Sequence, residues 1–344
     1  MTLSRRAFFL LAAASALALL PSCNRDSGKI KIAVVTNNPE DFWTICEKGA
    51  KDAADKHGVE LIFRRPDKAE AGIQLNILNE LVAKGVKGIA VSVIDPDNQT
   101  PDLKRITGQT NLITMDNDAT ESGRLCYIGT DNYEAGKAVG RLIKEVMPNG
   151  GTVALFVGQI TPINARLRVN GVLDELAGQK DAKGPTFGKY TLYRNEAITD
   201  EGQRAKCLDN AKDALAKLTG TENLCMVGLW AYNAPAILEA VKSKNLAGKV
   251  KIVSFDEDAA TLSAIEAGEI YATVVQDPYN FGYKSVEVLA EAAKSGDKAS
   301  LSKEPVRNIP YRVVAKEASK DPFTKADRLA VGPFRTELNR LMGR

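Results

Sequence analysis

This 344-residue sequence is poor in the residue types on which most enzyme chemistry depends. Its single histidine, His57, falls at the predicted end of a helix, so acid–base catalysis by histidine has no candidate. The first predicted strand is not followed by GxGxxG, and neither the phosphate loop GxxxxGKS/T nor a GxSxG nucleophile turn is present. A glycosidase that uses Asp116 and Asp256 as its carboxylate pair is the remaining enzyme alternative, and we predict no catalytic residue.

The charge shows no excess of one sign. The chain has 46 Lys and Arg against 43 Asp and Glu, a net charge of +3, and no basic block, which argues against a nucleic-acid partner. The stretch Asp95-Pro96-Asp97 begins like a calcium loop, but Thr100 stands where glycine is needed and Ile106 where the closing glutamate is needed. We predict no cofactor and no metal site.

Cysteine is scarce and lacks the CxxC or Cys/His spacing of a zinc site. Four of the cysteines lie in or beside apolar runs, and we expect most of them to be buried free thiols. Outside the cytoplasm a disulfide is also allowed, and the three possible pairings stay open. These four residues are Cys46, Cys126, Cys207 and Cys225.

The N-terminus has the pattern of an export signal. Residues 4–6 are Ser-Arg-Arg, and residues 7–20 form an apolar run that is too short to span a bilayer comfortably. The start resembles a twin-arginine motif, although general secretion stays open, and residues 20–23 resemble a lipobox. We predict an export signal over residues 1–23, lipid attachment at Cys23, and a location in the periplasm or on the outer face of the cytoplasmic membrane. An ordinary signal peptide with a chance cysteine is the alternative.

The rest of the chain alternates short apolar runs with helical stripes. Such runs suit parallel strands that are covered on both faces. After residue 130 the alternation begins again, which predicts an α/β fold of two doubly wound lobes with parallel sheets. The expected strands are 31–36, 59–63, 87–93, 112–115, 127–130, 152–157, 224–229, 251–255 and 271–275.

Polar and aromatic side chains follow most of these strands. In open parallel sheets, ligands bind at the carboxyl ends of the strands. Carboxylates, amides and an arginine satisfy a polyol as acceptors and donors, and aromatic rings cover the C–H faces of a sugar. Any single one of these residues could instead cap a helix or lie in the core. Together they predict a binding cleft for a hydroxyl-rich ligand.

Several of these stretches are similar to motifs of one family. Asn38-Pro39 with Phe42-Trp43 resembles an NPFF or NPFW loop that carries a two-residue insertion, and Asp116 ends ITMD, which is similar to ITLD. Further similar stretches are NARLRVNG, which contains Arg168, IVSFD, which ends at Asp256, and ATVVQDP, which contains Gln276. On these residues, roughly 29–312 of the chain resemble the type I periplasmic sugar-binding proteins of ABC importers, of the ribose-binding type.

The resemblance implies a set of ligand-binding residues, with two departures. Asn117 replaces an arginine, which puts ribose itself in doubt, and the expected asparagine aligns either with Trp230 or with Asn233. An aromatic ring at position 230 would suit a pyranose or a cyclic polyol. The implied ligand-binding residues are Asn38, Phe42, Trp43, Asp116, Asn117, Arg168, Trp230, Asn233, Asp256 and Gln276.

The family also implies an architecture and a function. One lobe would comprise residues 29–130 and 277–307, the other residues 131–276 and 308–325, with a three-segment hinge between them and a tail over residues 326–344. Hinge closure would bury a monosaccharide or cyclic polyol and present it to an ABC permease in the inner membrane. The chain would be a monomer, held at the membrane by its lipid anchor only. The alternative is a receptor for a sugar or a furanose-like signal that works with a chemoreceptor or sensor kinase.

Overall fold

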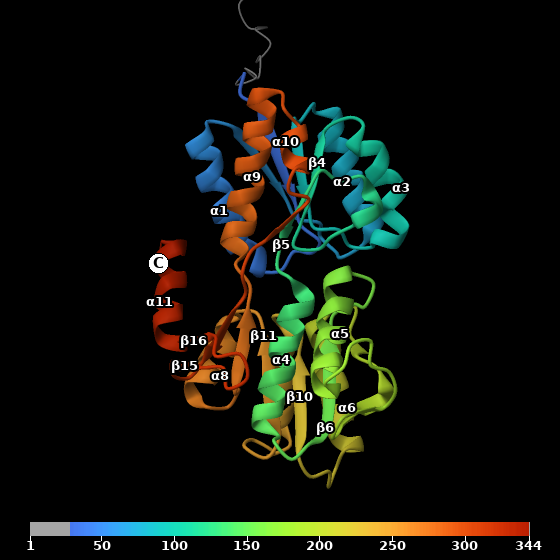
Figure 1. Cartoon of the computed structure of the whole chain (residues 1–344), viewed down its shortest axis with the longest axis vertical. Coiled ribbons are helices and arrows are strands. Elements are labelled where there is room, and N and C mark those ends of the chain that lie inside the picture. Colours follow the sequence, from blue (N-terminus) through green and yellow to red (C-terminus); the bar gives the residue numbers. More distant parts are fainter. Residues whose placement is uncertain (1–27, 344) are drawn as a thin grey trace, which may run out of the picture.

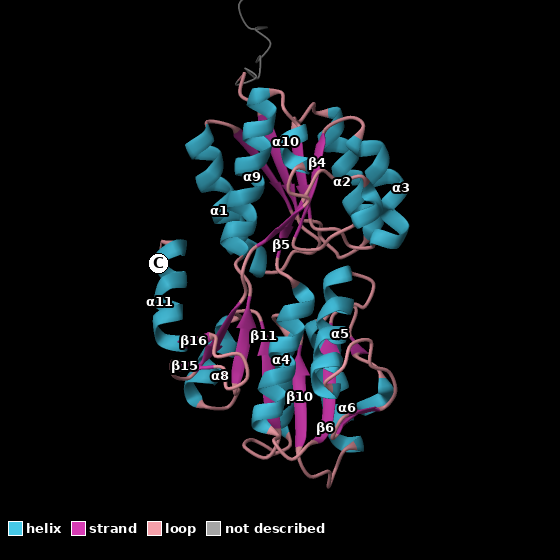
Figure 2. Cartoon of the chain, viewed as in Figure 1, coloured by secondary structure: helices cyan, strands magenta, loops and turns pink. Residues whose placement is uncertain are grey.

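The computed structural model describes residues 28–343, so Cys23 and the predicted export signal lie outside the described residues. The chain forms two α/β lobes, one above the other along the long axis (Figure 1). Each lobe is built around its own sheet with helices on both faces (Figure 2). The predicted α/β fold of two lobes is confirmed.

The first sheet is parallel throughout, in the order β13-β5-β4-β3-β1-β2. Ile32 and Val34 of β1 pack under α1 (Phe42–His57) and α9 (Pro278–Ser295). Ala33 and Val35 of the same strand pack under α2 (Ala71–Ala83) and α3 (Pro96–Thr107). Because successive side chains on a strand point to opposite faces, a continuous apolar run lets one strand serve both layers. The strands are β1 (Lys31–Val35), β2 (Glu60–Arg64), β3 (Gly88–Val91), β4 (Asn111–Met115), β5 (Tyr127–Gly129) and β13 (Val306–Asn308).

The helices of this lobe lie on the two faces of that sheet. Helices α1 and α9 lie side by side on one face, and α2 and α3 on the other (Figure 1). The α-helices are α1 (Phe42–His57), α2 (Ala71–Ala83), α3 (Pro96–Thr107), α9 (Pro278–Ser295) and α10 (Ala299–Ser302), with a 3₁₀ turn η1 (Thr120–Ser122).

The second sheet is parallel at its centre, where β12, β11, β10 and β6 pair in that order. Antiparallel pairs occur outside that centre, between β12 and β14, β15 and β16, and β7 and β8. The short peripheral strands lack the apolar runs on which the sequence prediction rested. The strands are β6 (Gly151–Val157), β7 (Thr186–Phe187), β8 (Tyr190–Leu192), β9 (Ile198–Thr199), β10 (Leu224–Gly228), β11 (Lys251–Phe255), β12 (Ala272–Val275), β14 (Arg312–Ala315), β15 (Ser319–Lys320) and β16 (Asp327–Ala330).

The helices of the second lobe follow the same layering. Leu155 of β6 packs with α4 and α5, and its neighbour Phe156 packs with α6 and α7 on the other face. None of the helices within residues 28–343 is long and apolar enough to cross a membrane. The helices are α4 (Asn132–Val146), α5 (Ile163–Ala177), α6 (Arg204–Lys217), α7 (Asn233–Ser243), α8 (Ala259–Ala267) and α11 (Val331–Met342), with a 3₁₀ turn η2 (Tyr193–Asn195).

The chain passes between the two sheets at three places. It leaves β5 for α4 through residues 130–131, leaves β12 for α9 through residues 276–277, and leaves β13 for β14 through residues 309–311. The carboxyl ends of the central strands of both sheets therefore face each other. The four described cysteines are buried free thiols, as expected for most of them.

Residues 326–344, which the sequence set apart as a tail, include strand β16 and helix α11. Strand β16 pairs with β14 in the second sheet, and Val331 and Phe334 of α11 are buried in the core of that lobe. At its other end α11 also lies close to α1 of the first lobe.

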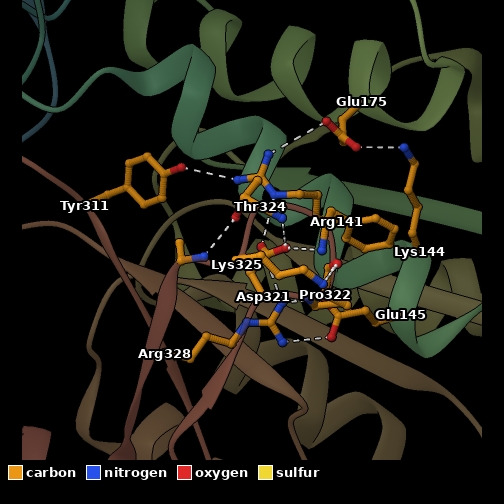
Figure 3. A network of polar contacts seen from close by, with 12 residues as sticks. Arg141, Lys144, Glu145, Glu175, Tyr311, Asp321, Pro322, Thr324, Lys325 and Arg328 are labelled. Atoms are coloured by element: carbon orange, nitrogen blue, oxygen red, sulfur yellow. Dashed lines mark hydrogen bonds and ion pairs between the residues drawn. The ribbon is translucent and has the colours of Figure 1, made fainter.

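A buried polar network fastens this segment to α4 (Figure 3). Nε of Arg141 donates to Oδ2 of Asp321 at 3.1 Å, and a guanidinium nitrogen of Arg328 lies 3.4 Å from the same oxygen. Arg328 also donates to Glu145 of α4 at 2.7 Å, and Arg141 donates to the hydroxyl of Tyr311 at 3.3 Å. Because buried charges are stabilised only when they are paired, these contacts fix where the segment lies.

Candidate functional site

A cavity lies between the lobes at the facing strand ends. It holds ≈ 420 Å³ of space not filled by atoms, part of which is open to solvent. Both lobes contribute to its walls. The lining residues are Asn37, Asn38, Glu40, Phe42, Trp43, Asp116, Asn164, Arg168, Trp230, Ala231, Tyr232, Asp256 and Gln276.

The loop after β1 builds the aromatic wall of the first lobe. Oδ1 of Asn38 accepts hydrogen bonds from Nε1 of Trp43 at 2.9 Å and from the backbone N–H of Glu40 at 3.0 Å. Phe42 packs edge-on against Trp43, with their ring centroids 5.1 Å apart. The Asn38 amide therefore holds the tryptophan against the core while both rings face the cavity.

Asp116 follows β4 in a left-handed backbone conformation, with φ at 61°. Such strain in a residue other than glycine clusters at functional sites. The carboxylate is buried, and Oδ2 accepts from the Ser92 hydroxyl at 2.8 Å. Burial raises the pKa of Asp116 to about 6, against the lowering effect of Arg168 and the Ser92 hydrogen bond.

Arg168 of α5 is the one basic side chain in the cavity lining and is 2% exposed. Nε donates to Oδ1 of Asn132 at 2.8 Å, and another guanidinium nitrogen donates to the Leu229 carbonyl at 2.9 Å. The same nitrogen lies 3.9 Å from a carboxylate oxygen of Asp256, and the guanidinium stacks on the ring of Phe255 at 3.9 Å. Contacts within the protein thus hold the guanidinium on several sides.

Two glycines allow the close helix packing that positions Arg168. A Cβ on Gly136 of α4 would lie 2.3 Å from the Arg168 carbonyl oxygen, and one on Gly171 of α5 would lie 2.2 Å from the Tyr133 carbonyl oxygen. Only glycine allows α4 and α5 to pack this closely. The close crossing brings the start of α5 to the strand ends.

Asp256 and Gln276 come from the two neighbouring strands β11 and β12. Asp256 also has a left-handed backbone, with φ at 68°, and its Oδ1 accepts from Nε2 of Gln276 at 2.9 Å. Burial raises the pKa of Asp256, although Arg168 opposes the shift. In each lobe, therefore, a strand is followed by an aspartate with a left-handed backbone conformation. These residues are Asp116 in the first lobe and Asp256 in the second.

Trp230 rather than Asn233 lines the cavity. Asn233 is fully buried, because its Oδ1 accepts from the backbone N–H of Trp230 at 2.9 Å and its Nδ2 donates to Asp200 at 2.9 Å. The Trp230 ring lies against Gly158, where an added Cβ would come within 2.2 Å of it. Of the two positions with which the expected asparagine could align, Trp230 therefore lines the cavity and Asn233 supports it.

Asn117 also lies outside the cavity lining. Its Nδ2 donates to the Val93 carbonyl, and its Oδ1 accepts from the backbone N–H of Asn164 at 3.0 Å. The second contact joins the first lobe to the start of α5 in the second lobe. A salt bridge between Asp97 and Arg166, at 3.1 Å, makes a further link between the lobes nearby.

Several buried polar atoms in the cavity lining have no hydrogen-bond partner. They are Oδ1 of Asn37, Oδ1 of Asn164, Oε1 of Gln276 and Nε1 of Trp230. Buried polar atoms in proteins are nearly always paired, and an unpaired one costs about 1–3 kcal/mol. Four such atoms from both lobes around one cavity are the pattern of a site that pairs them with a ligand.

Comparison with known proteins agrees with this geometry. The family model described as periplasmic binding protein domain matches residues 32–298. The chain belongs to this family. The family and fold that the sequence suggested are thereby confirmed.

Named relatives of this periplasmic binding protein are similar over most of their length. The D-allose-binding periplasmic protein of Escherichia coli is 27% identical over 282 residues, which cover 78% of this chain and 85% of that protein. The ribose import binding protein RbsB of Salmonella typhimurium is 28% identical over 298 residues, 84% of this chain and 92% of that protein.

Two solved structures are similar in both sequence and fold. GanP, a glucose-galactose binding protein from Geobacillus stearothermophilus, has a TM-score of 0.75 and 30% identity, over 84% of this chain and 98% of its own. A solute binding protein from Burkholderia graminis, in complex with D-arabinose, has a TM-score of 0.75 and 25% identity, over 86% of this chain and 97% of its own.

Five residues of the cavity lining were not assigned to it from the sequence. Asn37 and Tyr232 are next to residues that were assigned, and both follow strands, which is the signal that could have found them. Asn164 is the second residue of α5, after Pro162, which signals a helix start but not a wall of the cleft. The other two are Glu40, in the inserted part of its loop, and Ala231.

Outside the cavity, one group of described side chains could hold a metal ion. The potential ligand atoms of His57, Glu287 and Glu291 all lie within 4.8 Å of one another. Lys284 at 2.7 Å and Lys56 at 3.4 Å already pair with Glu287. The carboxylate charge is thus balanced without a metal, and we assign no site there.

Proposed function

We propose that this protein is the periplasmic substrate-binding component of an ABC importer, which binds a monosaccharide or a cyclic polyol between its lobes. The observation that carries the proposal is the ring of buried, unpaired polar atoms from both lobes around one cavity. A ligand with hydroxyls around a ring would pair them, since each hydroxyl both donates and accepts.

The lining residues divide the work of binding. Asp116 and Asp256 accept from hydroxyl groups, Arg168 donates to a ring or hydroxyl oxygen, and the Gln276 amide accepts. Rings of the lining, Trp230 among them, cover the apolar C–H faces of the ligand. Asn117 and Asn233 act indirectly, through the contacts that hold Asn164 and Trp230.

The relatives favour import over sensing. Those named above are ribose import, allose-binding and glucose-galactose binding proteins, and the alternative of a signal receptor is not favoured by them. They are binding proteins by name, so we infer that this chain is not an enzyme and that the pair Asp116 and Asp256 serves binding.

Closure about the three crossings would enclose the ligand in this cavity. Asn117 to Asn164 and Asp97 to Arg166 are contacts between lobes that an open form would lose. The closed monomer would then present its ligand to an ABC permease. Cys23 would hold the protein by lipid at the outer face of the cytoplasmic membrane or in the periplasm.

The test is a binding screen on the signal-free protein. Thermal shift against pentoses, hexoses, deoxy sugars and inositols, followed by calorimetry, should give a hit that raises the melting temperature by mass action. Asp256→Asn should weaken that hit by about tenfold or more, because a charged acceptor is lost. Asp209→Asn, at a side chain that is 77% exposed on α6, is the matched control. A folded protein that binds no sugar or polyol would refute the proposal.

A further inference from the structure

The cleft is acidic although the chain as a whole carries a net charge of +3. A second cavity of ≈ 1210 Å³ shares Asn38, Glu40, Trp230 and Tyr232 with the first and forms its mouth. Together the two linings hold six carboxylates and two basic side chains. The carboxylates are Glu40, Asp67, Glu70, Asp116, Glu201 and Asp256, and the basic residues are Lys68 and Arg168.

The two basic groups are already engaged. Arg168 lies 3.9 Å from Asp256 and is held by its other hydrogen bonds, so one guanidinium faces the two inner carboxylates. Lys68 lies 4.0 Å from Glu70. Lys206, which lies outside both linings, pairs with Glu201 at 2.5 Å. A neutral ligand would leave the carboxylates without a salt bridge, Glu40 among them, unbalanced, whereas a cation would balance this charge.

Glu40 is the carboxylate at the junction of the two cavities. Among the described residues, no lysine or arginine forms a salt bridge with its carboxylate. Arg65, which lies nearby, donates to its backbone carbonyl instead. Desolvation raises the pKa of Glu40, and the like charges of Asp41 beside it and of Asp258 from the opposite lobe raise it further. Acidic groups from both lobes thus meet at the mouth. A positive group between them would relieve their repulsion.

A second observation points to a ligand that donates. Gln276 is 2% exposed, and because its Nε2 donates to Asp256, its unpaired Oε1 is fixed as an acceptor facing the cavity. With the two inner carboxylates, the deep end of the site offers many more acceptors than donors. Ligand hydroxyls would donate to these deep acceptors, whereas an ammonium group, which donates three hydrogens and carries a positive charge, fits the Glu40 carboxylate of the same lining.

We propose that the ligand is a positively charged sugar, an amino sugar or aminocyclitol, whose ammonium group binds at Glu40 while its hydroxyls bind at Asp116 and Asp256. This inference rests on the proposed sugar-binding function and narrows its substrate class. The two-residue insertion that carries Glu40 is then the feature that sets the specificity.

The test compares neutral ligands with their amino counterparts. Calorimetry at pH 7 would measure D-glucose against D-glucosamine, D-galactose against D-galactosamine, their 3-amino and 4-amino isomers, and myo-inositol against an aminodeoxy inositol. In at least one pair the amino compound should bind about tenfold tighter or more, because a charged hydrogen bond replaces a neutral one. The preference should shrink as salt is added.

Glu40→Gln is the decisive variant, since it keeps the shape and removes the charge. It should bring the ratio of the two affinities in that pair close to one. Glu121→Gln, in η1 and outside both cavity linings, loses the same charge and should keep the ratio. Neutral sugars that bind as tightly as the amino compounds in every pair, or a ratio that survives Glu40→Gln, would overturn the inference and leave the sugar-binding function intact. No binding by any compound would overturn both.

Discussion

Gly158 supports the Trp230 ring, and one added carbon there should displace it. A Cβ at this position would lie 2.2 Å from two atoms of the indole, whereas carbon atoms in contact prefer about 3.5–4.0 Å. The ring must therefore move by at least about 1.3 Å. The Trp230 backbone is held by Asn233, so the side chain has to rotate out of its place in the cavity wall.

We expect Gly158→Ala to cost stability and, above all, affinity. Overpacking of this kind destabilises by about 1–3 kcal/mol, which urea denaturation would measure. Loss of the aromatic face should weaken sugar binding by about tenfold, measured by calorimetry with the hit from the screen. In a Trp230→Ala background the same substitution should have little further effect, because the atoms it displaces are gone.

Gly72→Ala provides the matched control. An added Cβ there meets nothing within 4 Å, and alanine is the better helix former, so stability should hold or rise slightly. Suppose instead that Gly158→Ala bound sugar as tightly as the wild type and melted at the same temperature. The indole would then not lie against Gly158, and our placement of Trp230 in the cavity wall would be wrong.

Three further predictions follow from the contacts described. Calorimetry from pH 7.5 to 5 should show the affinity for a neutral sugar falling, because Asp116 takes up a proton near its pKa of about 6. Over the same pH range this group should make the ligand-free fold more stable, and Asp116→Asn should flatten both trends. Asn117→Ala removes a contact between the lobes, so the Kd for sugar should rise about fivefold and small-angle scattering should show a larger fraction of open molecules. An unchanged scattering profile would contradict this prediction. Arg328→Met leaves Glu145 without its cation and Asp321 with Arg141 alone, and should cost about 3–5 kcal/mol in urea denaturation. Lys320→Met, whose pair with Asp327 is exposed, should cost at most about 1 kcal/mol.

Much of the site could be predicted because strand ends converge by topology. Asp116, Asp256 and Gln276 each follow an apolar run, and parallel strands place their carboxyl ends along one edge. The reasoning needs no distant partner, only the end of each run. Trp230 follows the same rule.

The same rule cannot separate residues that line the cavity from residues that support it. Asn117 and Asn233 also follow strands, yet their amides pair with Asn164, 47 residues away, and with Asp200, 33 residues away. Nothing local in the sequence records such partners. Contact with a ligand or with the protein interior is decided by chain segments that the periodicity of a strand does not report.

The last part of the chain escaped prediction for a related reason. Asp321 is paired with Arg141, 180 residues earlier, and the strands near it are two to four residues long. Short strands carry too few residues for an alternation to show. Their stability comes from the charged network and from Phe334, which packs into a core built mostly of earlier segments.

Helix α11 belongs to the second lobe but extends to the first. It is clamped to the second lobe by Arg335 with Glu266 at 2.8 Å and by Arg312 with Glu337 at 2.9 Å, yet its far end reaches the neighbourhood of α1 in the first lobe (Figure 1). If the protein closes about its three crossings as proposed, the distance between α11 and α1 should change when a ligand binds. Dyes placed on the exposed faces of these two helices would turn the molecule into an optical sensor for its own ligand, without any change to the cavity.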